Sequence, residues 1–546
     1  MSKRECEGVV HFRHGIKTSE AIDGLIEVRP ALWVGLVLVS GIPRILGAFL
    51  LPNAFGDAYV YIETIGGMSA RLSGGTFSLK DLFGFWLPMY QFICAVINVP
   101  VGHPFYVAKL VSAICGTGIC LLVFSISFRL TAHRTLALLS FTLIACNPLH
   151  ILHSASAMTD VPHAFFVMSS LYFALEKRWV PAAGFAAIAG LMRVESWMLF
   201  VLLPLLQFLD RRRISHAALV ILAIPPMLWL YICWRATGNA FAYFEVRSQY
   251  TEGLKASNPL LASFSLSRVL IDAGTLLGST DPAVMVGCLV GGWLVIRRQA
   301  RSIPERITEN PRDIVAACLY FFAFLGFILL AYVSGNQPEM WLRYGLILFA
   351  LGIPILSWTF LELRRRRPRQ AGKLSMLIIA VCFFQASIQL AGTVGFVNRV
   401  STQRLIADYL RVKYQADPRV RIFCDDGTVK ALSGIPFENF PAASDAPPDG
   451  ELFLASLKEK KVEYVVYMDG GSSTPTKLFP EPKDAADHDL LRPVMHASSK
   501  FFHTEIWLYQ FQSEREPVEI RDAITQTLRA DRPGSMTLPI HATKVK

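Results

Sequence analysis

Charged residues are scarce in this sequence. Only 17% of its 546 residues are Asp, Glu, Lys or Arg, whereas a soluble globular protein carries about a quarter. Hydrophobic residues make up 53%, and many apolar runs approach the roughly 20 residues that a helix needs to cross a bilayer. This composition excludes an ordinary soluble protein and predicts an α-helical polytopic membrane protein.

Motifs built on cysteine, glycine or a catalytic serine are also missing. Most of the ten cysteines lie inside apolar runs, and no C-x-x-C or Cys/His metal-binding spacing occurs. The polar C-terminal region has only Cys424, which excludes an internal disulfide framework there. We find no Gly-rich phosphate loop, no Ser/His/Asp arrangement and no internal repeat. His150, His153 and His163 lie close together in the sequence, but their spacing defines no metal site, and we interpret them as interfacial residues.

The formal net charge of +11 does not indicate nucleic-acid binding, because the cations gather between apolar runs. The cation-rich connections are 129–134, 177–178, 211–213, 297–301 and 364–369. A topology that places them and the N-terminus in the cytoplasm follows the positive-inside rule. It gives about eleven transmembrane helices. The expected spans are 31–51, 105–128, 135–152, 161–175, 181–192, 196–209, 217–234, 284–296, 314–333, 344–361 and 374–396.

The chain divides into four parts. Residues 1–29 form a cytoplasmic N-terminal segment, and residues 30–396 form the transmembrane domain. Residues 397–528 read as a small α/β domain outside the membrane, with strands expected at 420–424, 462–467 and 503–511 and a helix at 451–461. Residues 529–546 read as a loose tail. The first apolar run is too long and too far from the N-terminus for a cleavable signal peptide.

The first outer loop contains Asp57. Apolar residues recur after it with helical spacing up to Leu72, which predicts an amphipathic helix on the membrane surface. Asp57 stands at the start of this helix, where aspartate is a good N-cap. A carboxylate at the membrane–water boundary could equally serve as a catalytic base, and the local sequence leaves both interpretations open.

The same topology brings more ionisable residues to the outer face. Asp160 precedes a span, where it could act as a helix cap. Arg193 and Glu195 interrupt an apolar run, and their simplest role is a structural ion pair. Arg343 opens a late span, where it could snorkel to the interface or hold a phosphate. Further cations in or beside the outer loops are Arg235, Arg247 and Arg268.

The order of these features resembles the GT-C superfamily of integral membrane glycosyltransferases. The resemblance is greatest to the branch containing dolichyl-phosphate-mannose protein mannosyltransferases and the aminoarabinose transferases of lipid A. It covers roughly residues 30 to 396. The matching motifs are Asp57-Ala58-Tyr59-Val60-Tyr61, Leu87-Pro88-Met89-Tyr90, Asp160-Val161-Pro162, Arg193-Val194-Glu195 and Arg343-Tyr344. The chain departs from the family at Ala58, where the family often has Glu, and at Trp86-Leu87-Pro88, where close relatives have Lys-Pro-Pro.

The resemblance implies an inverting glycosyltransferase. Its donor would be a polyprenyl-phosphate sugar and its acceptor a hydroxyl group of an extracytoplasmic lipid, glycan or protein. The implied catalytic residues are Asp57, as general base, and Asp160. Arg343 and Arg193 would bind the donor phosphate, and the residues implied to position substrate are Tyr59, Tyr61, Glu195 and Tyr344. A divalent cation could take part, although the sequence contains no metal cluster that would identify one.

Two other functions compete with this one. A transporter or lipid flippase would line its path with intramembrane charges such as Arg44 and Lys109. A non-catalytic assembly protein of the cell envelope is the other alternative. The sequence has no Asn-X-Ser/Thr sequon, which leans toward a bacterial inner membrane as the location.

Overall fold

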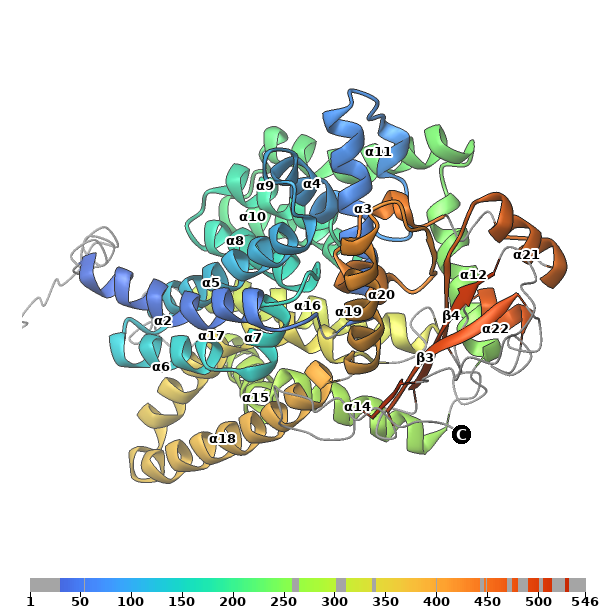
Figure 1. Ribbon diagram of the computed structural model, residues 1–546. Coiled ribbons are helices and arrows are strands. Elements are labelled where there is room, and N and C mark those ends of the chain that lie inside the picture. Colours follow the sequence, from blue (N-terminus) through green and yellow to red (C-terminus); the bar gives the residue numbers. More distant parts are fainter. Residues whose placement is uncertain are drawn as a thin grey trace, which may run out of the picture.

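The computed structural model describes residues 30–53, 55–257, 265–300, 311–335, 340–398, 400–441, 446–447, 449–468, 474–479, 490–499, 504–512 and 526–529. A bundle of helices forms one part, and a small sheet with its own helices packs beside it (Figure 1). The predicted N-terminal segment 1–29, and the tail from residue 530 on, lie outside the described residues.

Long apolar helices make up most of the bundle. Among the described residues, six helices are long and apolar enough to cross a bilayer, or eight if each of two bent pairs forms one span. The six are α2 Pro30–Leu50, α5 Pro104–Thr131, α11 His216–Thr237, α16 Pro311–Val333, α17 Leu342–Arg366 and α18 Pro368–Asn398. The chain is therefore a multi-pass helical membrane protein, as its composition predicted.

The eleven expected spans do not all form single long helices, because several of the apolar runs are bent or short. Residues 135–152 form a pair bent by 62° rather than one straight span, α6 Arg134–Ala145 and α7 Pro148–Ser154. A second pair, α14 Leu266–Thr280 and α15 Pro282–Ala300, bends by 88°. Three further predicted spans are helices of 16, 12 and 13 residues, shorter than a bilayer crossing: α8 Asp160–Leu175, α9 Trp179–Gly190 and α10 Leu199–Arg211.

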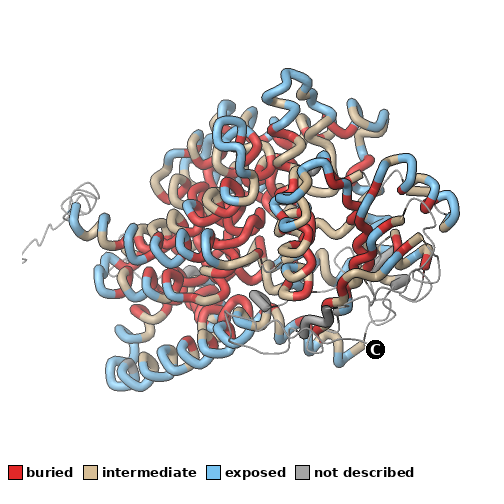
Figure 2. Tube along the Cα trace, in the orientation of Figure 1, coloured by how far each residue is buried: buried red, intermediate tan, exposed pale blue. Residues whose placement is uncertain are grey.

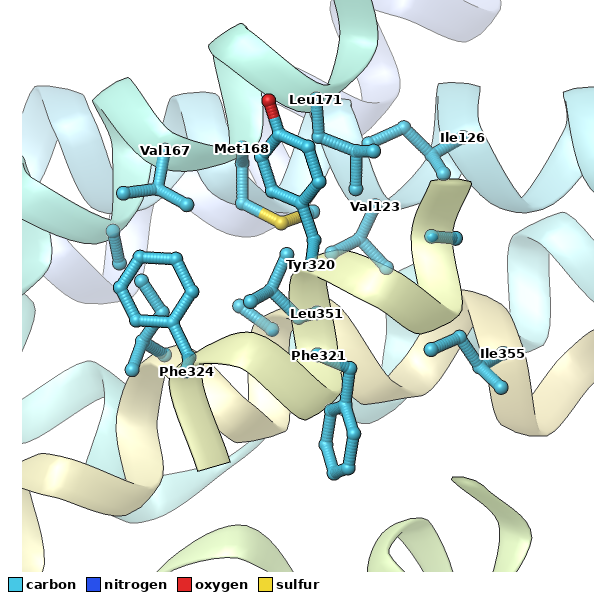
Figure 3. Packing of buried hydrophobic residues seen from close by; sticks show 14 of the residues in the cluster. Val123, Ile126, Val167, Met168, Leu171, Tyr320, Phe321, Phe324, Leu351 and Ile355 are labelled. Carbon is cyan, nitrogen blue, oxygen red and sulfur yellow. The ribbon is translucent and has the colours of Figure 1, made fainter. Parts of the chain in front are cut away.

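Helix α17 lies at the centre of the bundle, and most of its residues are buried, as Figure 2 shows for the bundle interior. Apolar side chains from α5, α8, α16 and α17 meet there (Figure 3). Tyr320 and Phe324 of α16 pack in this cluster with Leu351 of α17. The Tyr320 hydroxyl is 3.0 Å from the hydroxyl of Ser170, so its polar atom is satisfied inside the core.

Peripheral helices instead turn apolar side chains outward. In α18, Met376 and Phe383 are 75% and 74% exposed. Such exposure of large apolar side chains is unfavourable in water and favourable against lipid chains. The outer surface of the bundle is therefore built for a bilayer.

Shorter elements cover one end of the bundle. The helix predicted after Asp57 is present as α3 Gly56–Ser73, and its inner face buries Ile62, Ile65 and Met68. The short apolar stretch after it forms α4 Met89–Val101. The other elements at this end are the 3₁₀ helices η1 Leu79–Leu82 and η2 Val194–Met198 and the helix α12 Ala242–Ser257.

The C-terminal part is a mixed five-stranded sheet in the order β1-β2-β4-β3-β5. Its strands are β1 Ile422–Phe423, β2 Tyr464–Met468, β3 Leu491–Ser499, β4 Thr504–Phe511 and β5 Gln526–Arg529. Its helices are α19 Ser401–Ala416, α20 Gly427–Ser433, the 3₁₀ helix η3 Phe437–Asn439, α21 Gly450–Glu459 and α22 Thr474–Leu478. The predicted α/β character is confirmed, and β3 and β5 are strands that the sequence analysis missed.

This C-terminal part docks on the bundle through α20, which packs against α3. The Cα of Gly427 approaches Tyr59 so closely that a Cβ there would lie 3.6 Å from the Tyr59 Cβ. The Lys430 ammonium is 3.3 Å from the Glu63 carboxylate. The helix that begins with Asp57 is therefore held between the membrane bundle and the C-terminal sheet.

Candidate functional site

A cavity of about 750 Å³ opens where α3, the loop before α4, η2, α12 and the adjoining ends of α16 and α17 meet. This volume is in the range of small-molecule sites. The charged residues of its wall are Asp57, Arg193, Glu195, Arg247, Glu252, Lys255 and Arg343, and aromatic rings from residues 85, 86, 197, 243, 244, 250, 341 and 344 surround them.

Asp57 pairs with Arg343 in this cavity. The Asp57 carboxylate accepts a hydrogen bond from Nη1 of Arg343 at 2.6 Å. Phe55 is the N-cap of α3, and the cap position makes no side-chain hydrogen bond, so the interpretation of Asp57 as the cap is wrong. The Asp57 side chain is 41% exposed, so a molecule in the cavity can reach it.

Two largely buried carboxylates beside Asp57, those of Asp160 and Glu195, share one guanidinium. Arg193 donates to Asp160 at 2.6 Å and to Glu195 at 2.6 Å. Burial disfavours the ionised form of Glu195, but the charge and hydrogen bonds of Arg193 outweigh burial and lower the pKa of Glu195 to about 2. The predicted Arg193–Glu195 pair is thus present and includes Asp160 as a third member.

Exposure separates the roles of the three acids. The side chains of Asp160 and Glu195 are only 4% and 12% exposed, whereas Asp57 is open to the cavity. Asp160 does not cap its helix, since its carboxylate faces Arg193 and the N-cap Thr159 makes no side-chain hydrogen bond. Among these acids, Asp57 is therefore the one placed to meet a substrate.

Tyr344 completes this group, and the other two predicted tyrosines stand apart. The guanidinium carbons of Arg193 and Arg343 lie 5.4 and 6.0 Å from the centre of the Tyr344 ring. Tyr59 and Tyr61 are both buried and do not line the cavity. The Tyr59 hydroxyl donates to the carbonyl oxygen of Asn53 at 2.9 Å.

Tyr61 packs behind the cavity wall. Its ring centre lies 4.6 Å from that of Trp86 and 5.8 Å from that of Tyr90. Burial, followed by the charge of Asp160, raises the pKa of Tyr61 well above its ordinary value. The phenol therefore stays protonated and supports Trp86, a residue of the wall, from behind.

The three histidines are not interfacial, as the sequence had suggested, but buried. The His153 ring stacks on Phe55, with ring centres 4.3 Å apart, and so supports the start of α3. Nε2 of His163 lies 2.6 Å from the Ser196 hydroxyl. Both rings therefore brace backbone segments that carry cavity residues.

Sequence reasoning missed the wall formed by α12. Its cavity residues include Tyr243, Arg247, Thr251 and Lys255, which recur every four residues and therefore share one face. The Arg247 guanidinium lies 5.4 Å from the centre of the Phe85 ring, and no described carboxylate is within ion-pair distance of it. The four-residue spacing of two cations and a tyrosine was the available signal, since Arg247 was noticed only as one cation of a long loop.

The α12 wall matters because its charged residues change the net charge of the cavity. Three carboxylates, those of Asp57, Asp160 and Glu195, surround the two guanidiniums of Arg193 and Arg343. This cluster alone is negative and would repel a phosphate. Arg247 and Lys255 add two positive charges to the cavity wall, and Glu252 of the same helix offsets one of them.

The described residues contain no cluster of three or more metal ligands, whether His, Cys, Asp or Glu. The acids of the cavity cluster face arginine rather than one another.

The intramembrane cations have structural partners. Arg44 donates to the carbonyl oxygens of Ser40, Ile144 and Ala145 at 2.7, 3.1 and 3.3 Å. It thereby satisfies carbonyl groups at the end of α6, where the bent pair breaks. Lys109 donates to the carbonyl oxygen of Leu51. Both side chains are buried, and neither lines the cavity.

The chain is similar to known proteins in part of its sequence and in its fold. Residues 79–208 match the family model of dolichyl-phosphate-mannose-protein mannosyltransferase. A search of curated proteins finds no match. Two solved structures of ArnT from Cupriavidus metallidurans have similar folds at 12% identity. With the ArnT bound to undecaprenyl phosphate the TM-score is 0.53, covering 88% of this chain and 98% of that one; with the apo form it is 0.51, covering 91% and 99%.

The apo oligosaccharyltransferase of Archaeoglobus fulgidus matches at 11% identity with a TM-score of 0.47, over 89% of this chain and 75% of that one. The ArnT matches extend over nearly the whole chain. Residues 79–208 thus resemble the dolichyl-phosphate-mannose-protein mannosyltransferase family, and the chain shares the fold of ArnT.

Proposed function

We propose that the protein transfers a sugar from a polyprenyl-phosphate donor to a hydroxyl group of an acceptor on the outer face of the membrane. The observation that carries this proposal is the Asp57–Arg343 pair, which places an exposed carboxylate beside a guanidinium in a large cavity. A base and a phosphate-binding cation are the two groups that such a transfer requires.

In the proposed reaction, the acceptor oxygen attacks the anomeric carbon on the side opposite the phosphate. Asp57 takes the proton of the acceptor hydroxyl as the new carbon–oxygen bond forms. The bond between the anomeric carbon and the phosphate oxygen breaks, and the polyprenyl phosphate leaves with that electron pair. The anomeric configuration is inverted, because the attack and the departure occur on opposite faces.

The donor phosphate is proposed to lie between Arg343 and Arg247. Arg343 has one carboxylate partner, whereas Arg193 is held by two, so Arg193 is better suited to shaping the site than to binding a phosphate directly. This chain has Trp86 where the family resemblance leads one to expect a lysine. Arg247, lying over Phe85 beside it, supplies a cation on that side of the cavity.

The remaining cavity residues are proposed to position these groups. Asp160 and Glu195 fix Arg193, which in turn lies over the Tyr344 ring. Tyr59 and Tyr61 act indirectly, by holding α3 and the Trp86 loop. Asp160 is therefore proposed as a positioning residue rather than as a second base.

We further propose that residues 397–528 form an extracytoplasmic domain that helps to select the acceptor, and that the protein lies in a bacterial inner membrane. The contact of α20 with α3 supports the first point, because it places the C-terminal sheet on the side of the bundle that carries Asp57. The positive-inside rule supports the orientation.

The direct test is an assay of purified protein in lipid vesicles with radiolabelled polyprenyl-phosphate sugars and an extract of envelope acceptors. We expect the wild-type protein to transfer radiolabel into the acceptor fraction, and the Asp57→Asn variant to lose this transfer. Glu63→Gln is the matched control, since Glu63 lies on the same helix, is also 41% exposed and is also ion-paired. Movement of the donor across the bilayer without transfer would favour a flippase and overturn the proposal.

A further inference from the structure

Asp272 is a buried carboxylate outside the cavity, and no step of the proposed reaction uses it. It lies on α14, and its side chain is 8% exposed. One carboxylate oxygen accepts from the backbone N–H of Met340 at 3.0 Å, and the other accepts from the Tyr332 hydroxyl at 2.6 Å. Arg268, one turn earlier on α14, places its Nε 3.5 Å from that second oxygen.

These partners lie on both sides of one connection. Tyr332 is at the end of α16, and Met340 comes just before α17. The connection between these two helices leads directly to Arg343, three residues after Met340. The Asp272 side chain of α14 is thus hydrogen-bonded at both ends of the connection that precedes Arg343.

Helix α14 also packs closely against α17 on the C-terminal side of Arg343. A Cβ at Gly345 would lie 2.0 Å from Oγ of Ser279 and 2.5 Å from its Cβ, so the two helices touch closely there. Asp272 and Ser279 are seven residues apart, two helical turns, and therefore lie on the same face of α14. The start of α17 is consequently fixed at Met340 and at Gly345, with Arg343 between them.

The position of Arg343 decides whether it meets Asp57 and a phosphate. Hydrogen bonds to Asp57 and to a donor oxygen require the guanidinium to be held within a fraction of an ångström. Arg343 is ordered locally by its contact with the Trp341 ring, at 5.1 Å. That ring belongs to the same segment, so it moves with Arg343 and does not fix it to the rest of the protein.

We propose that Asp272 is a positioning residue for Arg343, acting through the backbone of Met340. This inference rests on the proposed function for its catalytic readout alone. Asp272→Ala removes every hydrogen bond of the carboxylate. Asp272→Asn keeps an oxygen for Met340, and its amide can donate to the Tyr332 hydroxyl, so it should rescue the position.

The first experiment needs no enzymatic activity. The parent protein for this test has Cys6 and Cys146 replaced by serine, so that neither of these thiols contributes to labelling. Met340 is 7% exposed, so a cysteine introduced at this position should react slowly with a maleimide. Asp272→Ala should increase that rate about tenfold or more, because the segment is released, and Asp272→Asn should leave it within about twofold. Equal rates in the Ala variant and the parent would overturn the proposal, whatever reaction the protein catalyses.

The second experiment is a double-mutant cycle in the sugar-transfer assay. Asp272→Ala should lower kcat/KM for the donor about 10- to 100-fold, yet cost little in an Arg343→Lys background, because the group that it positions is already altered. Asp313→Ala is the matched control: Asp313 is equally buried and bonds Arg129 at 2.8 Å at the opposite end of α16. The fold-loss in kcat/KM caused by Asp313→Ala should be the same in the wild-type and Arg343→Lys backgrounds, so the two losses should multiply.

A full, multiplicative loss for Asp272→Ala in the Arg343→Lys background would mean a merely structural role and overturn the proposal. Absence of any transfer by the wild-type protein would instead defeat the proposed function and leave the labelling result to decide. If Asp272→Ala does not fold, Tyr332→Phe removes one partner of the carboxylate. It should increase Met340→Cys labelling about two- to threefold, and an unchanged rate would then count against the proposal.

Discussion

The carboxylate of Asp57 accepts a hydrogen bond from Arg343 although the two residues are 286 positions apart. One belongs to a surface helix near the start of the chain and the other to the central helix of the bundle. Each neutralises the other while the cavity holds no substrate, which stabilises both charges in a partly buried place. If, as proposed, a phosphate takes the guanidinium as its partner, the Asp57 carboxylate is released from this ion pair and can accept a proton from the acceptor.

Substitution of Asp57 should remove catalysis without removing the fold. Asn at position 57 can still accept a hydrogen bond from Arg343, but its amide cannot take the proton of an acceptor. We expect Asp57→Asn to lower kcat about 10²- to 10⁴-fold, measured by sugar transfer in purified protein, with an unchanged melting temperature.

Asp160→Asn is the informative comparison. Asp160 is buried against Arg193, so its loss should disturb the site geometry and raise KM more than it lowers kcat. Near-normal transfer by Asp57→Asn, or a loss of kcat confined to Asp160→Asn, would contradict the assignment of the base.

Arg343→Lys tests the donor contact. Lysine keeps the charge and loses the planar fork that can bond Asp57 and a phosphate oxygen together. The donor KM should rise about tenfold or more, measured at saturating acceptor. Arg193→Lys should instead lower the melting temperature, because Arg193 holds two carboxylates. Identical donor KM and kcat in Arg343→Lys and wild type would reduce Arg343 to a structural role.

The orientation of the protein can be measured with single cysteines and an impermeant thiol reagent. The cation-rich end of α17 is expected in the cytoplasm, so Arg366→Cys should be shielded in intact cells. Asp449→Cys, at the start of α21, should react from outside. Labelling in the reverse pattern would invert the topology and with it the location of the cavity.

Asp426 should make the stability of the C-terminal part depend on pH. Its side chain caps α20 by accepting from the N–H of Val429 at 2.7 Å, and burial raises its pKa from 3.8 to about 6. The folded state therefore holds the proton more tightly than the unfolded state, so stability falls as pH rises from about 4 to 6. Above that window the ionised, buried group costs up to about 3 kcal/mol.

Asp426→Asn keeps the cap and removes the titration. The variant should exceed wild type in unfolding free energy at pH 7.5, and the difference should shrink toward pH 4.5. Chemical unfolding at both pH values measures it. A difference that does not change with pH would show that the Asp426 carboxyl titrates normally in the folded protein.

The sequence predicted the membrane class, the surface helix and most site charges because these depend on composition and on local periodicity. It could not tell which arginine pairs with which acid. Arg343 pairs with Asp57, and Arg193 with Asp160, only because distant helices pack side by side, and a single sequence contains no record of that packing. The sequence left Asp57 open as a helix cap or a catalytic base, and the structure has the N-cap two residues earlier, at Phe55.

The same reasoning explains the missed elements. Strand β3 contains Arg492 and Pro493 and lacks the alternation of a half-buried strand, and it is stabilised by pairing with β4 and β5 on either side. The bend between α6 and α7 could not be recognised in the sequence, because residues 135–152 read as one continuous apolar run. At this bend, Pro148 begins a new helix while Arg44 satisfies the carbonyl groups left at the end of the previous one.

The contact of Gly427 and Lys430 with α3 can couple binding at the C-terminal sheet to binding in the cavity, because both involve the same helix. If an acceptor binds the sheet more tightly when α20 is seated on α3, its binding stabilises the helix that begins with Asp57. Reciprocity then requires the donor, by ordering the same helix, to strengthen acceptor binding by the same factor. Synergistic binding of donor and acceptor would then arise from a shared helix, with no direct contact between the two substrates.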